Sequence, residues 1–337
     1  MAETPPLHIV RLDGIITPNP IFSPSFPHTY TSYPLVPFSS PSIITCLTTP
    51  KPANVAITTR VPITEETLQA CPALNLIAVL AIGTDMIDLA ACKRHSVTVC
   101  NVPAASNESV AEHAIALFFA ARRKVVRMHG MTVNGNEWGK TGTLKDEFGE
   151  LPGTCREEIV AIVGAGELGN RVASICRALG SKVHFAERKH SDTVRQGRIS
   201  FVECLQTSTT IFLTLPLSPE SLNLISTPEF ALMREDAILI NVARGGIVDE
   251  AALVQALEDK KIHAAATDVF VEEPAMMENV LVRTANRWRE EGSPFDGRLI
   301  LSPHIAWWAR SSIEKLRSTV GQNIEAWARG QPSKIVA

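Results

Sequence analysis

The sequence predicts an α/β protein of two domains, each with a parallel, doubly wound sheet. The chain has 337 residues, about twice the size of an average domain. Short apolar runs alternate with helical patterns in its first third, which is typical of strands separated by helices. From Glu158 onward the alternation becomes regular and opens on a glycine-rich turn.

The composition excludes several classes of protein. Hydrophobic residues make up 45% of the chain and charged residues 20%, with a mean hydropathy of +0.09, so wholesale disorder is excluded. A net charge of -3 provides no field that would gather nucleic acid or an acidic membrane surface, so we expect a small-molecule partner. The apolar stretches are too short to cross a bilayer and the N-terminus lacks the features of a signal peptide, which predicts a soluble, cytoplasmic protein.

The first domain is predicted from five apolar runs and two helical patterns. The predicted strands are His8–Leu12, Ser42–Leu47, Asn54–Thr59, Leu76–Ala81 and Val97–Asn101, and the predicted helices are Thr64–Ala70 and Met86–Arg94. Between Pro18 and Pro41 stand seven prolines, which remove backbone donors and prevent a helix. This segment is predicted to be a long surface loop inside the first domain.

A capping box from Ser109 to Glu112 predicts a long apolar helix that runs to about His129 and stops at Gly130. A last helix, Ser311–Ala328, is expected to leave the second domain and pack on the first. The second series of predicted elements has strands at Ile159–Val163, Lys182–Ala186, Thr210–Leu213, Ala237–Asn241, His263–Thr267 and Arg298–Leu301, with helices at Leu168–Leu179, Pro228–Leu232 and Glu250–Leu257.

A candidate dinucleotide site opens this second series. The strand Ile159–Val163 runs through Gly164-Ala-Gly166-Glu-Leu-Gly169 into a helix, the G-x-G-x-x-G pattern of a Rossmann fold. Gly164 permits the tight turn, Gly166 the approach of a pyrophosphate, and Gly169 the packing of helix on strand. Glu187 follows Gly169 by 18 residues (187 − 169), close to where a carboxylate binds the ribose hydroxyls.

The predicted cofactor is NAD, because the charge of Glu187 would repel the 2′-phosphate of NADP. NADP remains possible, since Arg188, Lys189 and His190 form a basic cluster that could pair with that phosphate if the glutamate turned aside. The other interpretation of Arg188 and Lys189 is a solvated loop.

Three polar segments each follow a predicted strand: Asn241–Asp249, Thr267–Pro274 and Leu301–Trp307. All three should therefore reach the carboxyl edge of the sheet, where ligands bind in open α/β folds. They supply a guanidinium (Arg244), carboxylates (Glu272 and Glu273) and an imidazole (His304). A guanidinium can bind a substrate carboxylate through two hydrogen bonds, a histidine can move a proton, and a carboxylate can orient that histidine.

With these segments the sequence resembles the D-isomer-specific 2-hydroxyacid dehydrogenase family, from about Thr58 to Ala337. The segments Phe185–Lys189, Pro303–Trp307 and Asn323–Trp327 look most like its glycerate dehydrogenase, or hydroxypyruvate reductase, branch. The resemblance implies an oxidoreductase that uses a nicotinamide cofactor to reduce a small 2-oxo acid, hydroxypyruvate or glyoxylate, to the D-2-hydroxy acid.

The resemblance also implies roles for the catalytic residues. Arg244 matches the substrate-orienting arginine, His304 the proton donor and Glu273 the partner of that histidine, with Glu272 as the alternative partner.

The substrate-binding residues implied by the resemblance lie in both parts of the chain. Ile82 and Gly83 match the loop whose amides hold the substrate carboxylate, and Arg60 is a candidate at the mouth of that pocket. Trp307 either walls the pocket or is a plain core residue.

The resemblance implies a flavodoxin-like substrate domain made of residues 1–105 and 306–337, with a cofactor domain of residues 106–305 inserted in it, and a homodimer through the cofactor domain. Asp268 matches a residue beside the nicotinamide. The residues expected to contact the cofactor are Gly164, Gly166, Glu167, Leu168, Gly169, Glu187, Arg188, Leu215, Pro216, Val242, Ala243, Asp268 and Val110. No metal is predicted, because no group of His and Cys residues has metal-ligand spacing.

Two departures from the family pattern leave the substrate open: Leu151–Glu158 differs from the usual short turn, and residues 278–297 are longer and more charged than in most relatives. The alternatives are a formate dehydrogenase, which usually carries glutamine where Glu273 stands, and a phosphoglycerate dehydrogenase, which needs more cations than Arg60 at the pocket mouth. A dinucleotide-sensing corepressor is the alternative from another class.

Overall fold

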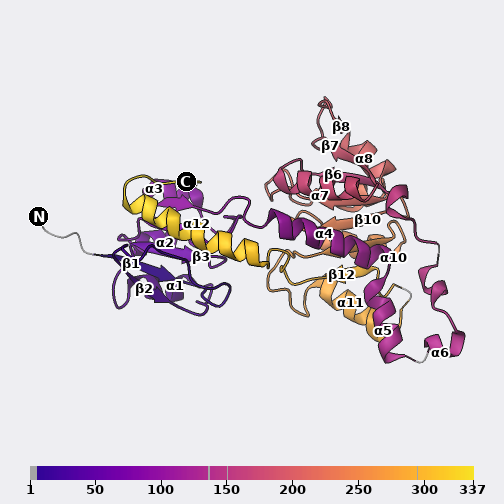
Figure 1. The fold of residues 1–337 in the computed structure, drawn as a ribbon, viewed down its shortest axis with the longest axis horizontal. Coiled ribbons are helices and arrows are strands. Elements are labelled where there is room, and N and C mark those ends of the chain that lie inside the picture. The colour runs from indigo at the N-terminus through magenta and orange to yellow at the C-terminus, as the bar shows by residue number, and fades with distance from the viewer. Residues whose placement is uncertain (1–5, 136, 150, 294) are drawn as a thin grey trace, which may run out of the picture. The chain divides into compact units, whose positions relative to one another are not determined.

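The chain folds into two compact units, Met1–Ser106 with Trp308–Ala337, and Asn107–Trp307 (Figure 1). The computed structural model describes residues 6–135, 137–149, 151–293 and 295–337. Each unit contains one sheet in which every pair of neighbouring strands is parallel. The predicted α/β class is therefore confirmed.

The first unit has a five-stranded sheet in the order β2-β1-β3-β4-β5. The last helix, α12, belongs to this unit and lies against β4, as the sequence predicted. The elements of the unit are β1 (Leu7–Arg11), β2 (His28–Ser32), α1 (Ser40–Thr48), β3 (Val55–Thr58), α2 (Glu65–Ala70), β4 (Leu76–Val79), α3 (Leu89–Arg94), β5 (Thr98–Cys100) and α12 (Arg310–Ala328).

The second unit has a seven-stranded sheet in the order β12-β11-β10-β9-β6-β7-β8. Its strands are β6 (Ile159–Val163), β7 (Lys182–Ala186), β8 (Arg198–Ile199), β9 (Thr210–Leu213), β10 (Ile238–Asn241), β11 (Ala264–Thr267) and β12 (Leu299–Leu301). Its α-helices are α4 (Asn107–Arg122), α5 (Val125–Asn134), α6 (Glu137–Thr141), α7 (Glu167–Ala178), α8 (Phe201–Thr207), α9 (Thr227–Phe230), α10 (Glu250–Glu258) and α11 (Val280–Glu290). Two short 3-10 helices, η1 (Lys145–Phe148) and η2 (Cys155–Glu157), precede β6.

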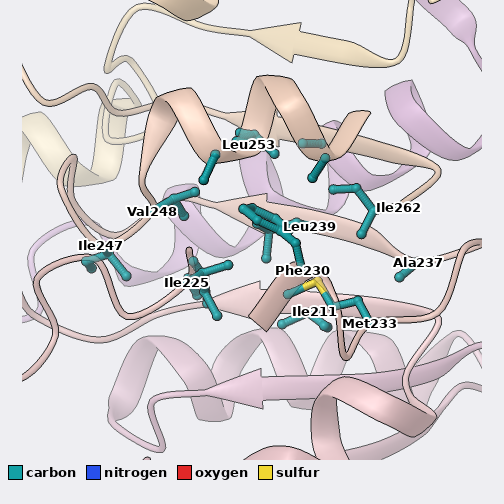
Figure 2. Close-up of a cluster of buried hydrophobic side chains, with 14 of the residues drawn as sticks. Ile211, Ile225, Phe230, Met233, Ala237, Leu239, Ile247, Val248, Leu253 and Ile262 are labelled. Atoms are coloured by element: carbon teal, nitrogen blue, oxygen red, sulfur yellow. The ribbon is translucent and has the colours of Figure 1, made fainter. Parts of the chain in front are cut away.

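Helices cover both faces of the second sheet, which explains its continuous apolar strands. Val160 and Ile162 of β6 pack with α4 and α7, whereas Ala161 and Val163 pack on the opposite face. On that opposite face Leu239 of β10 lies below Leu253 of α10 (Figure 2). A sheet buried on both faces exposes its ends, so the loops after the strands carry the polar chemistry.

The segment Ser42–Leu47 was predicted as a strand, and this was wrong because it lies inside helix α1. Pro41 stands in the first turn of the helix, where its missing N–H costs nothing. Ile43 and Leu47, four residues apart, bury the same face of the helix.

The proline-rich segment 18–41 is not a loop throughout, because it contains strand β2. The stretch His28-Thr-Tyr-Thr-Ser32 holds no proline and pairs with β1 at the edge of the sheet. The segment is also tied to α12, since the backbone N and Oγ of Ser23 donate to the carboxylate of Glu325 at 2.6 and 2.7 Å.

The helix predicted from Ser109 to His129 is two helices. Lys124 adopts a left-handed backbone (φ 48°), which ends α4 and begins α5. Helix α4 begins at Asn107, so Ser109 lies inside the helix and is not its cap. The sequence also missed β8, α8 and α11, which are short or strongly charged.

Candidate active site

The loops that follow three neighbouring strands bring together the predicted catalytic residues. Arg244 follows β10, Glu273 follows β11 and His304 follows β12, and these strands are adjacent in the sheet order. The carboxyl ends of parallel strands meet at one edge, so side chains distant in sequence become neighbours.

His304 is hydrogen-bonded to Glu273, with 2.5 Å between Nδ1 of the imidazole and Oε2 of the carboxylate. The other carboxylate oxygen accepts from the backbone N of Phe270 at 3.0 Å. The carboxylate occupies Nδ1, so Nε2 is the ring atom that can exchange a proton with a substrate.

The pKa of Glu273 lies below its ordinary value. Burial acts to raise this pKa, but the hydrogen bond and charge of His304, the amide of Phe270 and the charge of Arg244 outweigh burial. Glu273 is therefore ionised at neutral pH, and its carboxylate anion orients the imidazole of His304.

Arg244 is placed by a close approach between its own loop and the loop of Glu273. A Cβ atom on Gly245 would lie 1.7 Å from the carbonyl oxygen of Phe270, so only glycine fits there. The carbonyl of Arg244 accepts from Nδ2 of Asn241 at 3.0 Å, and its own guanidinium donates to the carbonyl of Ala243 at 2.8 Å. The Arg244 charge acts on Glu273, which puts the two side chains in one electrostatic environment.

Asp268 holds the loop that carries His304. Its side chain is 1% exposed and accepts from the amides of Ile305 and Ala306 at 3.0 and 2.9 Å. The His304 backbone is left-handed (φ 51°), a conformation that costs energy in a non-glycine residue and needs such support. Nε1 of Trp307 donates to the His304 carbonyl at 2.8 Å, so Trp307 also supports this loop.

His113 of α4, which the sequence did not single out, contacts residues that hold the His304 loop. Its Nε2 lies 3.0 Å from Oγ of Ser302 and 3.5 Å from Asp268. Ser302 in turn donates to Asp268 at 2.6 Å. No local pattern links α4 to the loop after β12, so only the packing of this helix reveals the contact.

The glycine loop has the shape that a dinucleotide requires. Gly164 has φ +111°, and a Cβ on Gly169 would lie 1.9 Å from the Gly164 carbonyl oxygen, so the turn and the helix contact both need glycine. The space around Gly166, the N-cap of α7, is open within 4 Å of a Cβ position. Together with Ala165 and Asn170, Gly166 lines an open hollow over the start of α7. A helix N-terminus facing an open hollow fits a pyrophosphate.

The other residues expected to contact the cofactor are also positioned around this edge. Leu215 and Pro216 follow β9, which pairs with β6, and Val242 and Ala243 follow β10, which pairs with β9. Val110 lies on α4, which packs on α7. Leu168 packs against the same core, whereas the Glu167 carboxylate accepts from Asn107 at 2.9 Å. Contacts of these residues with the cofactor stay predictions.

Glu187 directly follows β7, close to the expected position, but its carboxylate already has partners. Arg195, which sequence reasoning did not single out, forms an ion pair with it. Of the basic cluster considered for a 2′-phosphate, Lys189 is paired with Glu229 at 2.8 Å, whereas Arg188 and His190 are exposed. Lys189 is therefore occupied by a structural contact.

The residues expected to bind a substrate carboxylate in the first unit follow β3 and β4. The buried side chain of Asp13 accepts from the backbone N of Thr59 and of Arg60 at 2.6 and 2.9 Å and so fixes that turn. Within the described part of the chain, the buried Nε of Arg60 finds no hydrogen-bond partner. The carbonyl of Ile82, next to Gly83, accepts from Asn101 at 2.7 Å.

In the described ranges, no group of three or more His, Cys, Asp and Glu side chains is arranged to hold a metal ion. None of the helices that the structure describes is both long and apolar enough to span a membrane.

A glycine loop at the start of a parallel sheet, with an arginine and a glutamate–histidine pair at its carboxyl edge, defines a nicotinamide-dependent dehydrogenase. Residues 115–306 match the model of the D-isomer specific 2-hydroxyacid dehydrogenase, NAD binding domain. The chain belongs to the D-isomer specific 2-hydroxyacid dehydrogenase family, and it is an NAD(P)-dependent enzyme of that family.

Relatives with different substrates share this fold. The chain is 34% identical over 315 residues to the glycerate dehydrogenase of Methylorubrum extorquens, covering 93% of each chain. It matches a D-lactate dehydrogenase from Aquifex aeolicus, complexed with NAD and lactic acid, with a TM-score of 0.71, 25% identity and 90% coverage of both chains. An acyclic imino acid reductase in complex with NADPH and D-Arg matches with a TM-score of 0.78 and 23% identity over 98% of this chain and 100% of the other.

Proposed function

We propose that this enzyme reduces a small 2-oxo acid, hydroxypyruvate or glyoxylate, to the D-2-hydroxy acid. The observation that carries this proposal is the His304–Glu273 pair beside Arg244, because it combines a proton donor with a cation for the substrate carboxylate. The similarity to a glycerate dehydrogenase over nearly the whole chain supports the substrate class.

In the proposed mechanism each residue has one task. The Arg244 guanidinium binds the carboxylate of the 2-oxo acid and polarises its carbonyl group. His304 donates the proton on Nε2 to the developing alkoxide, and the ionised Glu273 stabilises the imidazolium before transfer. The nicotinamide cofactor, bound at the glycine loop, supplies the hydride.

The proposal assigns cofactor binding and the catalytic residues to the second unit, and further substrate-binding residues to the first. Arg60, Ile82 and Gly83 are the proposed carboxylate-binding residues of the first unit, and the unpartnered Arg60 Nε supports that role.

The substrate is tested by comparing kcat/KM for several acids and one neutral aldehyde. Hydroxypyruvate is expected to be reduced more efficiently than phosphohydroxypyruvate or 2-oxoisocaproate, because it is the 2-oxo acid that corresponds to glycerate, for which the relative with 34% identity is named. Glycolaldehyde is expected to be a poor substrate, because it lacks the carboxylate that the Arg244 guanidinium is proposed to bind. A spectrophotometric assay with NADH and NADPH measures all four, and formate oxidation is assayed beside them. Efficient turnover of glycolaldehyde or formate contradicts the proposal.

We propose that the protein is a homodimer formed through the cofactor domain. Helices α5 and α6 expose Val126 and Trp138, whose exposed fractions are 57% and 55%, and a contact with a second copy would cover them. Sedimentation velocity should give about twice the 36.6 kDa chain mass. The double variant Val126→Glu/Trp138→Glu should sediment as a monomer, whereas Val202→Glu on α8 should not. A monomeric wild type at about 10 μM, well above the nanomolar affinity of a stable interface, argues against this assembly.

A further inference from the structure

The carboxylate of Glu187, at the expected ribose position, is fully engaged by the protein. One oxygen accepts from the backbone N of Arg188 at 2.8 Å and from Nη2 of Arg195. The other accepts from the backbone N and from Nε of Arg195, at 3.1 and 2.8 Å. Each oxygen therefore already accepts two hydrogen bonds, which leaves little capacity for ribose hydroxyls.

Positively charged side chains outnumber the single negative charge at Glu187. Its side chain is 3% exposed, and the Arg195 guanidinium contacts both oxygens in a bidentate pair. Nη1 of Arg198 lies 4.0 Å away and donates to the carbonyl of Ala186 at 3.2 Å. The exposed Arg188 is adjacent, so one carboxylate is accompanied by three guanidinium groups.

A buried carboxylate neutralised in this way does not repel a phosphate as an unpaired one does. The expectation of NAD preference rested on an unpaired Glu187 facing the ribose. The Arg195 side chain is 52% exposed, so its guanidinium is accessible to an incoming anion. A 2′-phosphate can pair with this cation. A 2′-hydroxyl is uncharged, so the surrounding charges do not repel it.

We infer that Arg195 is a specificity-determining residue that neutralises Glu187 and thereby lets the enzyme accept the 2′-phosphorylated cofactor as well as the unphosphorylated one. This inference rests on nucleotide binding at the glycine loop and is independent of which 2-oxo acid is reduced. It makes Arg195 the determinant of cofactor choice, although Glu187 occupies the usual position.

Isothermal titration calorimetry with ADP-ribose and 2′-phospho-ADP-ribose tests the inference without catalysis. The two Kd values should agree within about tenfold for the wild type. Arg195→Gln leaves the Glu187 charge exposed to the ligand and should raise the Kd ratio against the phosphorylated nucleotide by at least about tenfold, or about 1.4 kcal/mol. Lys182→Gln removes one positive charge at the other end of β7 and should leave the ratio unchanged.

A double variant separates neutralisation from any structural effect of losing Arg195. Glu187→Gln/Arg195→Gln removes both charges, so its Kd ratio should return toward the wild-type value. An Arg195→Gln ratio equal to that of the wild type overturns the inference, as does a double variant that discriminates as strongly as Arg195→Gln. Binding of both nucleotides by a protein that reduces no 2-oxo acid refutes the proposed substrate and leaves the role of Arg195 standing.

Discussion

Replacing His304 by alanine should lower kcat for 2-oxo acid reduction by roughly two to four orders of magnitude, the usual contribution of a general acid. Glu273 is hydrogen-bonded to Nδ1 of the imidazole, which leaves Nε2 as the ring nitrogen that can donate a proton to the alkoxide. Stopped-flow or steady-state kinetics measures kcat, and the Kd for NADH should change little. A variant with near-normal turnover identifies another group as the acid.

Glu273 and Glu272 provide a matched pair of variants for the same step. Glu273→Gln removes the anion that orients His304 and should lower kcat at least about tenfold, whereas Glu272→Gln should have no comparable effect. The pH profile should follow the same logic. Reduction consumes a proton and oxidation releases one, so a rise in pH should favour oxidation. Because the pKa of Glu273 is lowered, its carboxylate is lost only as pH falls below its ordinary titration range.

Replacing Arg244 by lysine should lower kcat/KM for hydroxypyruvate by about one to two orders of magnitude. Lysine keeps the charge but loses the planar fork that binds a carboxylate through two hydrogen bonds. The loss of one hydrogen bond to a charged group costs about 1.5 to 3 kcal/mol. The effect should appear for every 2-oxo acid, because all share the carboxylate that Arg244 binds.

The control for Arg244 is the same change on an exposed arginine of helix α11. Arg289→Lys should leave kcat/KM at the wild-type value. If Arg244→Lys and Arg289→Lys behave alike, the carboxylate anchor lies elsewhere in the chain.

The short apolar runs show which elements a local sequence pattern can predict and which it cannot. β6 and the glycine loop that follows it were predicted correctly, because a buried strand, a turn and a helix are encoded within a few consecutive residues. Ser42–Leu47 was not, because a short apolar run fits a strand or one face of a helix, and tertiary packing of Ile43 and Leu47 decides between them.

The sequence by itself determined the α/β class, the family, and the strand ends that carry Arg244, Glu273 and His304, since each depends on local order along the chain. Only the tertiary structure decided which charges pair. Glu272 and Glu273 have nearly the same sequence surroundings, yet only Glu273 is within hydrogen-bond distance of His304, 31 residues away. No sequence pattern singled out Arg195 either. The turn between β7 and β8 brings it to Glu187. Electrostatic interactions depend on distance in space, and that distance exists only once the chain has folded.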